Sequence, residues 1–89
     1  MPSVSVIIPT RNESANIVRV IEEVKEASPK SNVIVVDDSS DNRLTRMLAL
    51  MSGAQVIEGQ HKGLGQAIID GIKASDSDIV VVMLSLIHI

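Results

Sequence analysis

The chain has 89 residues, a formal net charge of −3, no cysteine and no aromatic residue. Without cysteine it has no disulfide, no thiolate metal site and no cysteine nucleophile, and its acidic balance argues against a nucleic-acid partner. The most apolar stretch, residues 79–89, is about half the ~20 residues of a membrane helix. We therefore expect a small cytoplasmic domain, or a piece of a larger protein, with no membrane segment.

The first half of the chain alternates β-branched runs with amphipathic segments. Val4–Ile8 is predicted to form a buried strand, and the apolar residues of Ile17–Ala27 recur at helical spacing. Asn12 or Ser14 is the predicted cap of that helix. The unbroken apolar run Val33–Val36 predicts a parallel strand that is covered on both faces.

The second half repeats this alternation. We expect a second helix capped by Asp41, a strand over Ala54–Ile57, a third helix after Gly63, and a fourth strand over Ile79–Met83. The predicted inner face of the second helix consists of Leu44, Met47, Leu48 and Met51. That of the third consists of Leu64, Ala67, Ile68, Gly71 and Ile72. Met47, Met51 and Met83 are predicted to be core residues.

Three strand–helix units followed by a strand are typical of the α/β class. We predict a three-layer, Rossmann-like parallel sheet in the order 3-2-1-4, with the helices divided between its faces. In such a sheet, ligands bind outside the carboxyl ends of the strands, where the strand order reverses.

Polar residues follow the first two strands at that edge. An aspartate after a strand usually only caps a turn, but two in succession point to opposite faces. We therefore predict a structural role for Asp37 and a ligand-binding role for Asp38. The Asp38 carboxylate can accept the ring N–H of uracil, or the N1–H and amino group of guanine.

Pro9, Arg11 and Glu13 surround the turn after the first strand. A rigid turn with a capped helix explains the proline and partly explains Glu13, which complements the helix dipole. It does not explain Arg11, which can stack on a base or contact phosphate. Glu13 can also accept hydrogen bonds from ribose hydroxyls.

Residues 61–67 contain Gly63 and Gly65 before the third helix. Two interpretations remain open for them. The glycines can form an anion-binding loop at a helix N-terminus, or they can allow close packing against the sheet, as Gly71 can.

Taken in order, three motifs carry a family resemblance: Val-Ser-Val-Ile-Ile-Pro-Thr-x-Asn-Glu at 4–13, Val-Val-Asp-Asp-Ser-Ser at 35–40, and Lys-Gly-Leu-Gly-x-Ala at 62–67. Over residues 3–83 the chain resembles the inverting family 2 glycosyltransferases of GT-A fold, most of all their dolichol-phosphate mannose synthase-like branch. The resemblance implies a GDP-mannose or UDP-sugar donor and, for the intact enzyme, a polyprenyl phosphate acceptor at the cytoplasmic face of the membrane.

By position, the resemblance implies that Pro9, Arg11 and Glu13 line the base and ribose pocket. It also implies that Val36 and Asp38 lie against the base. The family commonly has tyrosine where this chain has Arg11, so we expect altered rather than abolished binding.

The chain departs from the family after its fourth strand. There the family has Asp-x-Asp, which holds Mg²⁺ or Mn²⁺, but this chain has Leu84 and Leu86. Leucine cannot ligate a hard cation, so we expect no metal site here and Mg²⁺ or Mn²⁺ in the intact enzyme. Residues 84–89 resemble translated adapter sequence. We therefore expect the native part to be residues 1–83, an N-terminal fragment with no catalytic residue and no turnover.

The leading hypothesis is therefore the nucleotide-sugar-binding half of a transferase of mannose or glucose. An alternative is a stand-alone nucleotide-binding or interaction module without catalysis. A receiver-like signalling domain is a third hypothesis. It is disfavoured because it needs an acidic pair after the first strand and an aspartate after the third, where this chain has Pro9-Thr10 and Glu58-Gly59.

Overall fold

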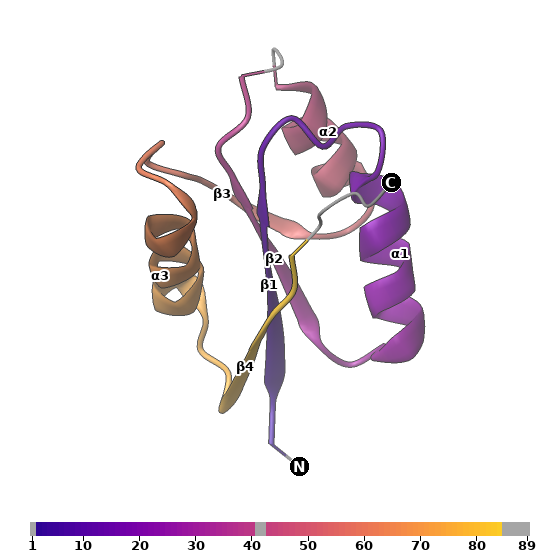
Figure 1. Cartoon of the computed structure of the whole chain (residues 1–89). Coiled ribbons are helices and arrows are strands. Elements are labelled where there is room, and N and C mark those ends of the chain that lie inside the picture. Colours follow the sequence, from indigo (N-terminus) through magenta and orange to yellow (C-terminus); the bar gives the residue numbers. More distant parts are fainter. Residues whose placement is uncertain (1, 41–42, 85–89) are drawn as a thin grey trace.

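Figure 1 shows the computed structural model, which describes residues 2–40 and 43–84. Its strands are β1 (Val4–Thr10), β2 (Asn32–Asp37), β3 (Gln55–Glu58) and β4 (Ile79–Val82). Its helices are α1 (Ile17–Ala27), α2 (Leu44–Met51) and α3 (Leu64–Ala74).

The described strands form one parallel sheet in the order β3-β2-β1-β4. This confirms the predicted topology. The strand order reverses at β1, because β2 and β3 follow on one side of it and β4 returns to the other side. A receiver domain places its third strand beside its first. Here β1 lies between β2 and β4, so the topology excludes the receiver alternative.

The core consists of aliphatic side chains on the two faces of the central strands. Successive strand residues point to opposite faces, so β1 and β2 each supply both layers. One face carries Val6, Ile8, Val33 and Val35, which pack with Ile17, Ile21 and Val24 of α1 and with Ala49 of α2. The other face carries Ile7, Ile34 and Val36, which pack with Ala67 of α3. Figure 1 accordingly shows α1 and α2 on one side of the sheet and α3 on the other.

The buried face of α2 differs from the predicted one. Thr45 and Ala49 are fully buried, whereas Met47 and Met51 are 56% and 80% exposed. The prediction that these methionines belong to the core is wrong, because small residues one turn apart set the contact face and rotate the apolar stripe outward. Met83, after the edge strand β4, is also exposed. The predicted cap Asp41 lies outside the described residues, and the N-cap position of α2 is Arg43.

Helix α3 lies close to the sheet at Gly71. A Cβ built on this glycine would collide with Ile7 Cγ2 and would lie 3.1 Å from Val36 Cγ2. The glycine therefore sets the distance between helix and sheet. Leu64 and Ile72, predicted for the inner face, are each about half exposed, because the close approach at Gly71 and Ala67 leaves them at the margins of the interface.

None of the helices within residues 2–40 and 43–84 has the length and apolar character that crossing a membrane requires.

Replacing Gly71 with alanine should lower the free energy of unfolding by about 1–3 kcal/mol, because the new methyl group overpacks the core at Ile7. Gly65→Ala, in the same helix, is the matched control, because a Cβ there has no neighbour within 4 Å. It should leave stability unchanged or raise it by up to about 1 kcal/mol. Urea denaturation followed by circular dichroism measures both, and equal effects would contradict the packing role of Gly71.

Candidate functional site

A cavity of about 450 Å³ opens at the carboxyl edge of the sheet, beside the N-terminus of α3. Its volume lies within the range of small-molecule sites. Among its lining residues are Pro9, Arg11, Glu13 and Asp38, four of the five residues predicted to bind a ligand. The cavity therefore lies where the strand order predicts a ligand site.

Val36 is the fifth predicted residue, and it does not line the cavity. Its side chain has no solvent exposure and packs with Ile7 and Ile34 under α3. That Val36 lies against a base stays a prediction. The backbone of Val36 helps to hold Thr10, which lines the cavity, because the Val36 carbonyl oxygen accepts a hydrogen bond from Thr10 Oγ1 at 3.4 Å.

The register of β1 and β2 holds the two main walls of the cavity together. Thr10 pairs with Asp37 at the end of the ladder, and the Asp38 N–H continues it by donating to the Thr10 carbonyl oxygen at 3.0 Å. Asp38 therefore leaves β2 directly beside the turn that carries Arg11 and Glu13.

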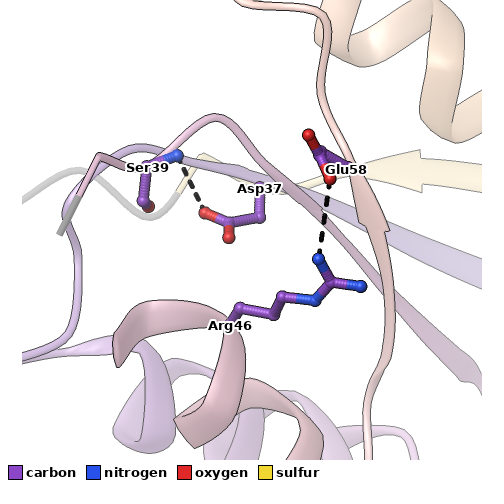
Figure 2. A network of polar contacts seen from close by, with 4 residues as sticks. All are labelled: Asp37, Ser39, Arg46 and Glu58. Carbon is purple, nitrogen blue, oxygen red and sulfur yellow. Dashed lines mark hydrogen bonds and ion pairs between the residues drawn. The ribbon is translucent and has the colours of Figure 1, made fainter. Parts of the chain in front are cut away.

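The two adjacent aspartates point in different directions and have different partners. Figure 2 shows the Asp37 carboxylate accepting a hydrogen bond from the Ser39 N–H, at 2.9 Å, next to the Arg46–Glu58 ion pair. Asp37 is only 8% exposed, and it closes the turn after β2. Asp38, by contrast, lines the cavity on the side of α3.

Asn12 joins the two loops behind these walls. Its N–H donates to Ser39 Oγ at 2.8 Å, and its Oδ1 accepts the Ser40 N–H at 2.8 Å. The predicted capping by Asn12 or Ser14 is therefore wrong. The N-cap position of α1 is Asn16, whose side chain makes no capping hydrogen bond. Asn12 has a φ of 53°, a left-handed conformation that asparagine tolerates better than most residues.

The side chains of Arg11 and Glu13 are available for a ligand. Among the described residues, neither has a side-chain hydrogen bond or an ion pair. Glu13 uses its carbonyl oxygen to start α1, accepting the N–H groups of Asn16 and Ile17 at 2.9 and 2.8 Å. The cavity wall thus presents one cation and one anion to whatever occupies it.

The glycine loop before α3 forms the opposite wall. Gly63, the N-cap residue of α3, has a φ of 97°, which only glycine adopts readily. A Cβ on Gly63 or Gly65 would meet no atom within 4 Å, so close packing explains Gly71 but not these two. The first N–H groups of α3 have no partner within the helix, and Gly63 and Leu64 line the cavity.

Sequence reasoning missed the part that His61 plays. Nothing in the sequence distinguishes His61 from an ordinary loop residue, but the His61 N–H donates to Asp38 Oδ1 at 3.0 Å. His61 has a φ of 58°. No sequence signal marks this contact, because it uses the backbone and joins residues that are 23 positions apart.

Within the described part of the chain, the side chains do not fit a divalent metal ion. Residues 2–40 and 43–84 contain no cluster of three or more histidine, cysteine, aspartate or glutamate side chains that could hold one. Leu84 lines the cavity beyond β4, and its side chain offers only carbon atoms. Leu86, the second predicted departure, lies outside the described residues, as does the rest of 85–89.

Comparisons with known proteins show which family the chain belongs to. The model of the family "Glycosyl transferase family 2" matches residues 5–83. A dolichol-phosphate mannosyltransferase of Pyrococcus furiosus is 35% identical over 86 residues, which are 90% of this chain and 24% of that protein. A low-salt glycan biosynthesis hexosyltransferase of Haloferax volcanii is 44% identical over 69 residues, 74% of this chain and 16% of that protein.

Among solved structures, the chain resembles glucosyl-3-phosphoglycerate synthase of Mycobacterium tuberculosis in complex with Mn²⁺, UDP and glucosyl-3-phosphoglycerate. The TM-score is 0.82 and the identity 30%, over 94% of this chain and 33% of that one. The chain thus spans about a third of this structure and a quarter or less of the curated relatives.

Asn12→Gly should lower the free energy of unfolding by about 0.5–1.5 kcal/mol, because it removes the side-chain hydrogen bond to Ser40. Glycine adopts the same positive φ, so backbone strain is not introduced. Asn16→Ala is the control: without a capping bond to lose, it should cost less than the ~1 kcal/mol typical of N-cap replacements. Thermal denaturation compares the two, and a larger loss for Asn16→Ala would contradict the assignment.

Proposed function

The chain belongs to glycosyl transferase family 2, and we propose that it forms the nucleotide-sugar-binding part of a hexosyltransferase. The observation that carries the proposal is the convergence of Arg11, Glu13 and Asp38 in one cavity at the switch point of the sheet. The proposal covers residues 1–83.

Each of these side chains has a chemical role that suits a nucleotide. Asp38 accepts hydrogen bonds from the base. Glu13 accepts hydrogen bonds from the ribose hydroxyls, while Arg11 stacks on the base or contacts phosphate. Pro9 gives the wall between them a fixed backbone. Fold similarity alone would not assign these roles, and they rest on the lining of the cavity.

The start of α3 suits the diphosphate. Its unpaired N–H groups and the positive end of its dipole favour an anion, and Gly63 keeps the backbone open toward the cavity. Base, ribose and diphosphate would thus share one cavity, with the ribose at Glu13.

The donor is a GDP- or UDP-activated hexose, and the acceptor is a phosphate-bearing molecule. The Pyrococcus relative is named a dolichol-phosphate mannosyltransferase, which supports a polyprenyl phosphate and mannose. The mycobacterial neighbour was solved with UDP and glucosyl-3-phosphoglycerate, which supports a UDP-sugar.

A divalent metal belongs to the intact enzyme in this proposal. The mycobacterial neighbour was solved with Mn²⁺ and UDP together, whereas the described residues of this chain offer no suitable group of ligands. When bound, such an ion neutralises charge on a leaving diphosphate.

A stand-alone binding module without catalysis is the second candidate. It is favoured because residues 2–40 and 43–84 contain no cluster of three or more histidine, cysteine, aspartate or glutamate side chains that could hold a metal ion. Both candidates bind a nucleotide, so transfer of hexose from a radiolabelled nucleotide sugar to a polyprenyl phosphate separates them.

Asp38→Ala should weaken UDP or GDP about ten- to a hundredfold, because a hydrogen bond to a charged acceptor is worth ~1.5–3 kcal/mol. Pyrophosphate has no base and should bind almost equally to both proteins. Isothermal titration calorimetry measures the four affinities. If Asp38→Ala weakened UDP and pyrophosphate equally, Asp38 would support the fold or the phosphate site and would not read the base.

Mn²⁺ or Mg²⁺ should change the affinity of the chain for UDP or GDP by less than about twofold. The reason is that Leu84 stands where the family has a carboxylate, and hard cations need oxygen ligands. Titration of the chain with UDP or GDP, with and without millimolar Mn²⁺ or Mg²⁺ at matched ionic strength, tests this. A tenfold gain, about 1.4 kcal/mol, would show that Asp37, Asp38 or another acid recruits the ion.

A further inference from the structure

We propose that Gly59 and the backbone N–H of His61 hold the Asp38 carboxylate with only Oδ2 presented to the base, so that the site prefers uracil to guanine. The inference rests on the proposed nucleotide site and names its base. Gly59 is a positioning residue in this account, because it acts on the ligand only through Asp38.

The Asp38 carboxylate is fixed by its first oxygen. Oδ1 accepts the His61 N–H at 3.0 Å. The carboxylate accepts no other hydrogen bond from the described residues. His61 is in the left-handed region, with a φ of 58°. This conformation is uncommon for a residue other than glycine, and it is maintained here in the loop that carries the N–H to the carboxylate.

Gly59 leaves the space that the carboxylate occupies. A Cβ built on Gly59 would overlap Asp38 Oδ1 and would lie 3.0 Å from Oδ2. Gly59 itself is buried, and its N–H donates to the Asp37 carbonyl oxygen at 2.8 Å. It is thus anchored to the end of β2 and cannot easily move away from Asp38.

Space, not backbone conformation, requires glycine at this position. The positive-φ glycines among the described residues are Gly53 and Gly63, and Gly59 is not one of them. Alanine is therefore allowed by the backbone at position 59. Its only direct effect would be to push the Asp38 carboxylate out of its place.

This arrangement leaves one acceptor for the base. Oδ1 already accepts the His61 N–H and lies against Gly59, whereas Oδ2 accepts no hydrogen bond from the described residues, and Asp38 lines the cavity. Uracil has a single ring N–H to donate there. Guanine has two neighbouring donors, its N1–H and its amino group, and needs both carboxylate oxygens. Its second donor would lose water without gaining a partner, which is costly for a desolvated group.

The test compares UDP, GDP and pyrophosphate by isothermal titration calorimetry, using the whole chain and its variants. We expect the unaltered chain to bind UDP at least about tenfold more tightly than GDP. Gly59→Ala should remove most of this preference by weakening UDP, and should leave pyrophosphate unchanged. Adding Gly59→Ala to Asp38→Ala should change nothing further, because Gly59 acts through Asp38. Met51→Ala, at an exposed residue of α2 that does not line the cavity, is the control and should bind UDP as the unaltered chain does.

Three results overturn the inference while leaving the nucleotide site intact, provided Asp38→Ala still weakens UDP. These are equal or tighter binding of GDP, unchanged UDP affinity in Gly59→Ala, and a full additional loss in the double variant. If Gly59→Ala weakens UDP and pyrophosphate together and also lowers the melting temperature, Gly59 is structural and the inference again fails. If Asp38→Ala leaves UDP unchanged, the proposed function itself falls.

Discussion

The parallel pairing of β1 with β2 is the constraint on which the site depends. At the end of this ladder Thr10 pairs with Asp37, and the Asp38 N–H donates to the Thr10 carbonyl oxygen. These contacts join the ends of two strands whose residues are 27–28 positions apart in the sequence. Asn12 adds a second connection by bonding the loop after β2. Because both strands are anchored by fully buried aliphatic side chains, the positions of Arg11, Glu13 and Asp38 follow from the register and not from the loops alone. A core without aromatic residues is sufficient for this, since Ile and Val fill both faces of the sheet.

The sequence was a reliable guide to the sheet and a poorer one to the helices. Long β-branched runs such as Val33–Val36 have few alternatives to a buried strand, and the strand order followed from the alternation of elements. Helix α2 shows why the helix faces were harder to predict. It has apolar residues on most of its circumference, so periodicity could not decide whether Met47 and Met51 or Thr45 and Ala49 face the sheet, and the structure buries the smaller pair. The bounds of α1 were predicted, but its cap was not, because Asn12 bonds across to another loop instead of capping.

Side chains that line the cavity because they follow a strand could be predicted from the sequence. Contacts made by backbone groups could not. Pro9, Arg11, Glu13 and Asp38 all line the cavity, because position at the end of a strand is visible in a sequence. Val36 does not line the cavity, since its side chain, one position before the strand end, points into the core on the α3 side. The support of Asp38 by Gly59 and His61 was invisible, because it consists of an N–H group and an absent side chain. Leu84 was recognisable as a departure only by comparison with the Asp-x-Asp motif of the family. Because Leu84 lines the cavity, the departure places a hydrocarbon side chain where the family has a carboxylate.

The central claim is that one nucleotide occupies the cavity between the ends of β1 and β2 and the start of α3. Amide chemical shifts in ¹H–¹⁵N spectra of the labelled chain, followed during titration with UDP, test it most directly. The account predicts that the largest shift changes fall on residues 10–13, 38 and 61–65. Changes centred instead on Arg43 and Arg46, which line a separate small cavity on the α2 side, would contradict it.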